Sequence, residues 1–345
     1  MYARGFGCVK EGDLLAEERM AEAGEFGCIR RICRDLLVRP ERVAAGAGDD
    51  GAVYHVPAGW DQVISTDTMV EGIHFTEKTM TPYDVGWKLG ASNFSDMAAM
   101  GAEAAEFVVS AALPAALPLS WMERCYDGLR AICRRYGVNV LGGDVTGSLQ
   151  GVVLTGTIIG DVPAGQALYR SGALPGDVIA VTGCLGSSAA GLDALLQGLS
   201  GWEMIKKAHR RPCPQLAAGR WLREHGAHSA NDISDGLSSE ANEIAAASSV
   251  VMEIDGDAVP LLPETKDLAA FLGKDPLSYA LNGGEDYQLV FTLPEKTARL
   301  MAASFPVTVI GRVLEKAEEG AVYLVRGGRR ERLLPEGYDH FPHHS

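Results

Sequence analysis

Residues 45–54 read AGAGDDGAVY and contain the glycine spacing G-x-G-x-x-G. This spacing binds a dinucleotide only where a strand leads into the glycine turn and a helix follows it, because the helix N-terminus holds the pyrophosphate. Here Pro40 interrupts the approach, and the following AVYHVPAGW predicts a short strand instead of a helix. The stretch therefore argues against a Rossmann domain. It leaves two readings of Asp49 and Asp50: an acidic surface turn, or a site that binds something other than bare phosphate.

A chain of 345 residues is long enough for two domains, each with its own hydrophobic core. The net charge of −14 and the lack of a basic patch argue against a nucleic-acid partner. No segment is apolar enough to span a membrane, and the charged N-terminus does not resemble a signal peptide, so a cytoplasmic location is predicted. The seven cysteines form no C-x-x-C pair, which predicts reduced, structural thiols.

Apolar periodicity predicts helices and strands in alternation, hence an α/β fold with mixed sheets. The most distinct helix begins at Thr81 as N-cap, with Pro82 as its first helical residue and Gly101 near its end. Glycine and proline cluster in residues 161–177, which places a domain boundary near residue 163. We expect an N-terminal extension (1–24), an N-terminal α/β domain (25–162) and a C-terminal α/β domain (163–345).

The expected elements of the two domains are as follows. In the N-terminal domain, strands are predicted at 62–70, 105–114, 139–145 and 151–162, and helices at 26–37, 81–102 and 120–137. In the C-terminal domain, strands are predicted at 178–183, 250–255, 287–293, 307–314 and 321–326, and helices at 187–198, 214–225 and 237–248.

Aspartates recur beside glycines, at strand ends and on one helix. Lys88, Ser92 and Asp96 are spaced four residues apart, so they form a polar stripe on an otherwise apolar helix. A single Asp-Gly pair is usually a turn, but several acids beside glycines, which let other groups approach closely, favour a shared binding function. The set comprises Asp49, Asp50, Asp67, Asp96, Asp144, Asp232 and Asp235.

These acids are best suited to a hard cation with oxygen ligands. Mg²⁺ binds a few carboxylates together with phosphate oxygens and water. The EF-hand spacing, zinc-ligand spacings, the Walker A pattern and the kinase loop signatures are all absent. In a chain of this negative charge, metal ions must supply the positive charge that phosphates need. At least one of Asp49 and Asp50 is therefore predicted to hold a metal ion that contacts phosphate.

A series of motifs runs in order from about residue 24 to 341: GAGDDGAV, ISTDTMVEGIHF, SNFSDMAAMGA, LGGDVTGS, DISDGLSSE, NGGEDYQLVF and GYDHF. The series closely resembles the thiamine-monophosphate kinase family, within the superfamily of aminoimidazole ribonucleotide synthetase and selenophosphate synthetase. The resemblance implies the two-domain fold of that superfamily and a homodimer built through the N-terminal domains. It also implies that ATP, with several Mg²⁺ ions, phosphorylates thiamine monophosphate to thiamine diphosphate.

The resemblance also implies roles for individual residues. It implies a metal shell at Asp50, Ser65, Thr66, Asp67, Asp96, Asp144, Asp232 and Asp235. It implies ATP contacts at Tyr126, Gly143, Asp144, Arg170 and Ser234, and substrate contacts at His74, Glu285 and Phe341. No catalytic base is assigned, because the acceptor is a phosphate oxygen that is already ionised and catalysis rests on positioning and metal electrostatics.

Two other functions remain open. One is an ATP-dependent enzyme similar to aminoimidazole ribonucleotide synthetase, which also needs only ATP and Mg²⁺. The other is a regulator that binds metal or nucleotide without catalysis. The chain departs from the family pattern at Val145 and Gly147, where relatives often carry Thr and a basic residue. Selenophosphate synthetase is disfavoured, because Cys28 lies in a helical pattern instead of a glycine-rich loop.

Overall fold

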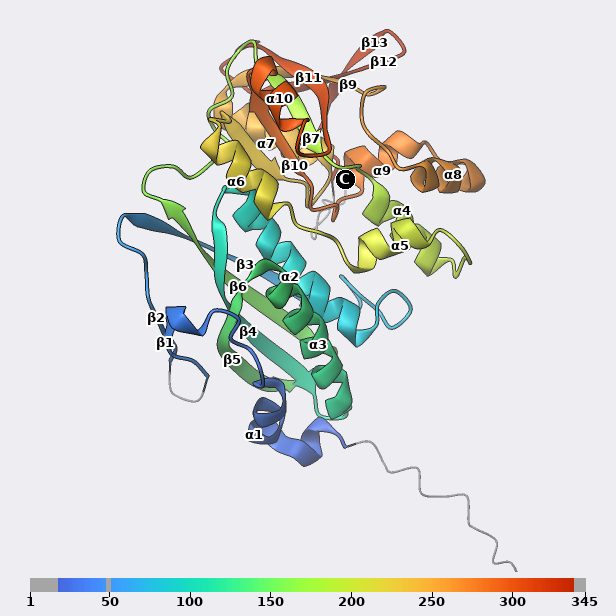
Figure 1. Cartoon of the computed structure of the whole chain (residues 1–345). Helices are drawn as coiled ribbons and strands as arrows, with labels where there is room; N and C mark the ends of the chain where they lie inside the picture. The colour runs from blue at the N-terminus through green and yellow to red at the C-terminus, as the bar shows by residue number, and fades with distance from the viewer. Residues whose placement is uncertain (1–17, 48–50, 338–345) are drawn as a thin grey trace, which may run out of the picture.

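The computed structural model describes residues 18–47 and 51–337 (Figure 1). Its first element is helix α1 (Met20–Ile32). It begins inside the segment expected to lie outside the fold, and the predicted helix 26–37 is therefore placed too late. The side chain of Glu22 accepts the N–H of Arg19 at 3.0 Å and caps the helix start. Met20 is buried in the N-terminal core, whereas Gly24 has a non-helical φ of 66° that interrupts the pattern. A 3₁₀ turn (Pro40–Arg42) and the short strands β1 (Val43–Ala45) and β2 (Val53–Tyr54) follow.

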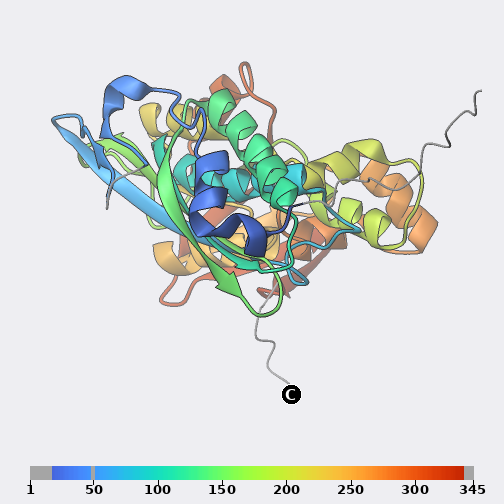
Figure 2. The ribbon, with the colours of Figure 1, turned by 90° about the horizontal axis from the view of Figure 1, so that it is seen from below.

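A four-stranded sheet forms the core of the N-terminal half. Its strands are β3 (Trp60–Val70), β4 (Glu103–Pro114), β5 (Asn139–Ser148) and β6 (Val153–Pro163), in the order β3-β6-β4-β5. Only β4 and β5 are parallel. Helices α2 (Pro82–Ala99) and α3 (Leu119–Tyr136) lie side by side on one face (Figure 2). Successive side chains along β3 alternate between the two faces of the sheet. Asp67 and every second residue from it face α2, whereas Ile64, Thr66 and Thr68 point the other way.

Helix α2 carries much of the later site and begins as predicted. The side chain of Thr81 caps it, Asp84 completes the capping box and Pro82 occupies the first turn. Its crossing with α3 depends on two glycines. A Cβ on Gly86 would lie 1.8 Å from the carbonyl oxygen of Cys125, and one on Gly128 would lie 1.9 Å from that of Tyr83. The two backbones therefore touch, which fixes the position of the α2 polar stripe.

A seven-stranded mixed sheet forms the core of the C-terminal half, in the order β13-β12-β9-β11-β7-β10-β8. All neighbouring pairs are antiparallel except β12 with β9. The two mixed sheets confirm the predicted fold class. The strands are β7 (Val178–Thr182), β8 (Ser229–Asp232), β9 (Val250–Asp255), β10 (Leu289–Leu293), β11 (Val307–Lys316), β12 (Ala321–Arg326) and β13 (Arg329–Leu333).

The helices of the C-terminal half include several that the sequence did not predict. Helices α4 (Ser187–Leu196), α6 (Leu216–Glu224) and α7 (Leu237–Ser248) match predicted segments. Short helices α5 (Glu203–Arg210), α8 (Pro263–Leu272), α9 (Pro276–Asn282) and α10 (Glu295–Met301) were missed, as was β13. Three of the missed helices have only seven or eight residues, about two turns, so their apolar periodicity is short.

The two halves meet along α2. A Cβ on Gly219 of α6 would lie 2.0 Å from the carbonyl oxygen of Ala98, so these helices are in close contact. The hydroxyl of Ser95 donates to Oδ2 of Asp232 at 2.7 Å and links α2 to the end of β8. Across residues 18–47 and 51–337, no helix has the length and apolarity to cross a membrane. The six cysteines in that part of the chain are free, as predicted.

Candidate functional site

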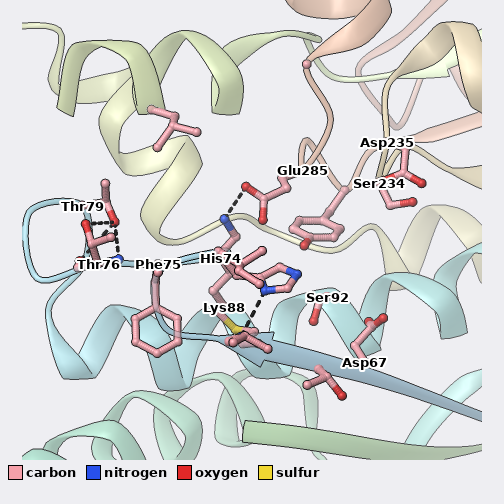
Figure 3. A pocket seen from close by; sticks show the side chains of 18 of the residues that line it. Asp67, His74, Phe75, Thr76, Thr79, Lys88, Ser92, Ser234, Asp235 and Glu285 are labelled. Atoms are coloured by element: carbon pink, nitrogen blue, oxygen red, sulfur yellow. Dashed lines mark hydrogen bonds and ion pairs between the residues drawn. The ribbon is translucent and has the colours of Figure 1, made fainter. Parts of the chain in front are cut away.

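A cavity of about 940 Å³ opens where the N-terminal sheet, α2 and the C-terminal loops meet (Figure 3). One end is lined by acids and the other mainly by apolar and aromatic side chains. The acidic end comprises Asp67, Asp96, Asp232, Ser234 and Asp235, with Thr66 and Ser92 beside them. The other end comprises Met69, Ile73, His74, Phe75, Thr76, Thr79, Leu192 and Leu196, and between the two ends lie Lys88, Glu285 and Tyr287.

The acids come from elements far apart in the sequence and are held by serine hydroxyls. Ser65 on β3 donates to Oδ2 of Asp96 at 2.6 Å, and Ser95 binds Asp232 across the junction. Burial, together with the charges of Asp232 and Asp67, raises the pKa of Asp96 to about 8. Burial likewise raises the pKa of Asp232 to about 6, and it raises the pKa of Asp67. Burial, followed by mutual repulsion, therefore disfavours the charged forms of these carboxylates when no cation is present.

This repulsion suits a cation-binding site that needs further ligands. In residues 18–47 and 51–337, no three His, Cys, Asp or Glu side chains lie close enough to hold a metal ion by themselves. Mg²⁺ often takes only one or two protein carboxylates and fills its remaining positions with water and phosphate oxygens. The acidic end therefore fits Mg²⁺ that arrives with a phosphate ligand, and Asp67, Asp96 and Asp232 are the residues that would hold it.

Two of the proposed metal ligands on the N-terminal sheet point away from this cluster. Thr66 lines the cavity, but its hydroxyl donates to the carbonyl oxygen of Gly156 on the neighbouring strand β6 and not to the acids. Asp144 lies on β5, at the opposite edge of the sheet from β3, and pairs in register with Ser110 on the face away from α2. Three strand spacings, about 14 Å, separate the two edges. Neither oxygen of Asp144 lines the cavity.

The predicted ATP contacts are also divided. Ser234 lines the cavity and donates to Oε1 of Glu240 at 3.2 Å. Arg170 lies just outside the cavity, where its Nε donates to Oδ1 of Asn231, the neighbour of Asp232, at 3.1 Å and forms an ion pair with Glu243 at 3.1 Å. Tyr126 is 4% exposed in the core around α3, where its side chain has a packing role.

Gly143 has a structural reason to be glycine. A Cβ there would lie 1.7 Å from the carbonyl oxygen of Val109 on the paired strand β4. The GGD motif therefore contains a residue that the sheet requires, apart from any contact with a nucleotide. Asp50 and Phe341, predicted to bind metal and substrate, lie outside the described residues.

The loop from Gly283 to Tyr287 places Glu285 in the cavity. Its backbone is held in unusual conformations, with φ of 56° at Glu285 and 49° at Tyr287, a region that costs about 1 kcal/mol or more for residues other than glycine. Asp286 offsets this cost by accepting the backbone N–H groups of Gly186 and Ser188 at 2.5 and 3.1 Å. The loop is thus fixed to the start of α4, and Glu285 projects toward α2.

A buried cation meets Glu285 inside the cavity, and sequence reasoning did not assign it a role. Nζ of Lys88 lies 2.6 Å from Oε2 of Glu285 (Figure 3). His209 on α5 is buried nearby, with Nδ1 at 3.6 Å from the same oxygen and 3.1 Å from the Ser188 hydroxyl. Burial, then the charges of Lys88 and Arg210, hold the pKa of His209 well below its usual value, so the imidazole is neutral. The predicted polar stripe on α2 was the available signal for Lys88.

His74 also projects into the cavity, beyond the end of β3. Its Nδ1 accepts the backbone N–H of Val70 at 3.0 Å, so the neutral ring carries its proton on Nε2. Beside it, Phe75 and Tyr287 supply aromatic surface. This end of the cavity can therefore hold a planar, partly polar organic group, while the acidic end binds phosphates through a metal.

Comparisons with known proteins follow this division into two halves. Residues 48–162 match the AIR synthase related protein N-terminal domain, and residues 175–323 match the C-terminal domain of the same family. The chain is 37% identical to the thiamine-monophosphate kinase of Bacillus subtilis over 328 residues, which cover 92% of this chain and 99% of that protein.

Two solved structures agree with this similarity. The thiamine-monophosphate kinase of Stenotrophomonas maltophilia K279a superimposes with a TM-score of 0.77 at 34% identity, covering 87% of this chain and 96% of the other. AaThiL complexed with AMPPCP and TMP gives a TM-score of 0.75 at 32% identity, covering 94% and 99%. Within the AIR synthase related class, the chain belongs to the thiamine-monophosphate kinase family.

Proposed function

We propose that this protein transfers the γ-phosphoryl group of ATP to thiamine monophosphate, giving thiamine diphosphate and ADP. The observation that carries the proposal is one cavity that combines an acidic end with an aromatic end, in a chain of this family. The related AaThiL is described with AMPPCP and TMP bound together, which supports binding of both substrates by this chain. The name of the Bacillus subtilis relative supports the same reaction.

The protein acts by positioning its two substrates. Asp67, Asp96 and Asp232 would hold Mg²⁺, which supplies positive charge to the transferring phosphoryl group. The serines that bind these acids keep the carboxylates oriented. The acceptor is an ionised phosphate oxygen, so no side chain has to remove a proton. In this scheme the sequence-based ligands Asp50, Asp144, Ser65, Thr66 and Asp235 remain proposals, and so do ATP contacts at Gly143, Arg170 and Ser234.

The aromatic end of the cavity is proposed to hold the heterocycles of the acceptor. Thiamine carries a cationic thiazolium and an aminopyrimidine, which favour a nearby carboxylate and aromatic faces. Phe75 supplies an aromatic face at this end of the cavity, Glu285 supplies a carboxylate between the two ends, and His74 also lines the cavity. Phe341, predicted from its motif, remains a proposed stacking residue. We also propose that residues 25–162 provide ATP and Mg²⁺ binding and dimerisation, and that residues 163–345 provide substrate and nucleotide contacts.

We expect the protein to be a homodimer that joins through the open face of the N-terminal sheet. Ile64 is 69% exposed on this face, within the edge strand β3, an unusual position for a large apolar side chain. Asp144 lies on the same face, so its proposed metal role depends on a second copy. Sedimentation at micromolar concentration should give the dimer mass for the unaltered chain and the monomer mass for Ile64→Arg. A monomer in both cases would contradict this arrangement.

The proposed reaction predicts a strict choice of acceptor. With ATP and Mg²⁺, the purified protein should release ADP when thiamine monophosphate is added. With free thiamine or formylglycinamidine ribonucleotide, ADP release should stay at the background level. Chelation of Mg²⁺ should abolish the release, because the acidic end would otherwise repel ATP. Consumption of the ribonucleotide would instead indicate an aminoimidazole ribonucleotide synthetase activity, and no turnover with any acceptor would favour a non-catalytic binding protein.

A further inference from the structure

The ammonium of Lys88 is an unusual charge to find inside this protein. Its side chain is 1% exposed, and burying an ammonium costs several kcal/mol unless a counter-charge compensates it. Glu285 supplies that counter-charge at 2.6 Å. Apart from this ion pair, Nζ has no hydrogen-bond partner in the part of the chain that the structure describes. The Lys88 ammonium, which lines the cavity, is therefore held in place by its ion pair with Glu285.

The two oxygens of Glu285 have different surroundings. Oε2 is the oxygen beside both Lys88 Nζ and His209 Nδ1. Within residues 18–47 and 51–337, no hydrogen bond or ion pair reaches Oε1, and the side chain is 28% exposed. Because Asp286 fixes the loop and Lys88 fixes one oxygen, the carboxylate cannot rotate freely. The remaining oxygen is left to accept N–H donors from a ligand (Figure 3).

Position along α2 indicates which end of the acceptor this pair meets. Lys88 and Asp96 are eight residues apart, so about 12 Å of helix separates them. The phosphoryl transfer is proposed to take place at the acids, and the Lys88–Glu285 pair lies between them and the Phe75–Thr79 end of the cavity (Figure 3). The backbone N–H of Glu285 donates to the carbonyl oxygen of Ser234 at 2.6 Å, whereas its side chain points toward Lys88. The group within reach is therefore the aminopyrimidine, whose exocyclic amine is an N–H donor.

We propose that Lys88 is a specificity-determining positioning residue, which holds the Glu285 carboxylate oriented so that Oε1 accepts a hydrogen bond from the amine of the acceptor's aminopyrimidine. The inference rests on the proposed function and deepens it. Lys88 acts through Glu285 and does not touch the phosphates. Its loss should weaken recognition of the acceptor and leave recognition of ATP unchanged.

A double-mutant cycle tests this role. Lys88→Met, Glu285→Gln and the double variant are compared by their KM for thiamine monophosphate and for ATP. We expect each single variant to raise the acceptor KM about 10- to 100-fold, the range for one charge-assisted hydrogen bond. The double variant should be no worse than Glu285→Gln alone, because Lys88 has nothing left to position. The KM for ATP should stay within about twofold in all three.

The control is another buried lysine. Lys206 is 7% exposed, donates to the carbonyl oxygen of Leu199 and does not line the cavity, so Lys206→Met should leave the acceptor KM unchanged. Thermal unfolding checks that each variant folds. If Lys88→Met does not fold, two other variants carry the test. Lys88→Gln keeps an N–H donor without the charge, and the double variant removes both charges.

Three results would overturn the role of Lys88 while the proposed function stands. The first is a rise in the acceptor KM of the double variant that equals the product of the two single-variant rises. The second is a rise in the KM for ATP equal to that for the acceptor. The third is an unchanged acceptor KM in Lys88→Met or, where that variant does not fold, in Lys88→Gln. Lack of thiamine monophosphate turnover by the unaltered chain would overturn the proposed function and this inference together.

Discussion

Asp96→Asn is expected to lower turnover by about 100-fold or more while making the metal-free protein more stable. The loss follows because Asp96 is the α2 carboxylate proposed to hold Mg²⁺. The gain follows because burial, and then the charges of Asp232 and Asp67, disfavour the ionised form of Asp96. Asparagine keeps the oxygen that accepts from Ser65. In the presence of a chelator, the thermal midpoint should rise by about 2–4 °C for each kcal/mol of repulsion removed.

The matched control is Asp127→Asn, which removes a carboxylate from an exposed position on α3, where it pairs only locally with Arg130. We expect little change in its turnover or its thermal midpoint. If Asp96→Asn kept normal turnover, or lost stability in the chelator, the acidic end of the cavity would not be a cation site. Loss of turnover with a raised midpoint separates a functional carboxylate from a structural one.

Gly128→Ala is expected to prevent normal folding. The added methyl group would lie 1.9 Å from the carbonyl oxygen of Tyr83, which is backbone and cannot move aside unless α2 and α3 separate. We expect a loss of about 3 kcal/mol or more in the free energy of unfolding, measured by denaturant titration. The same separation would displace Lys88 and Asp96, so the fraction that folds should also have reduced turnover.

Gly147→Ala is the corresponding control, because no atom lies within 4 Å of the position its Cβ would take. Its effect should stay within about 0.5 kcal/mol. Equal unfolding free energies for Gly128→Ala and the unaltered chain would show that the helices are not in backbone contact.

Local features were the most predictable part of the fold. The start of α2 follows from Thr81 and Pro82, and α7 occupies its predicted range, because caps and long apolar periodicities are encoded within a single segment. The stripe of Lys88, Ser92 and Asp96 was also predicted, and all three line the cavity. The start of α1 was not, since Gly24 interrupts its pattern.

Contacts between distant segments could not be predicted from the residues alone. The meeting of Asp67 and Asp232 depends on how the two sheets pack, and the sequence indicates it only as a pattern of recurring acids. The placement of Asp144 at the opposite edge depends on strand order, which spacing does not determine. The pairing of Lys88 with Glu285 joins residues almost 200 positions apart through an irregular loop conformation. Motif resemblance named Glu285 but gave no reason for its fixed orientation.

The measurement that tests the account most directly follows the γ-phosphate of ATP. The protein is incubated with γ-labelled ATP, Mg²⁺ and thiamine monophosphate, and the products are separated. We predict that the label appears in the terminal phosphate of thiamine diphosphate, in equal amount to the ADP formed. Label released as inorganic phosphate, with thiamine monophosphate unchanged, would contradict direct phosphoryl transfer to this acceptor.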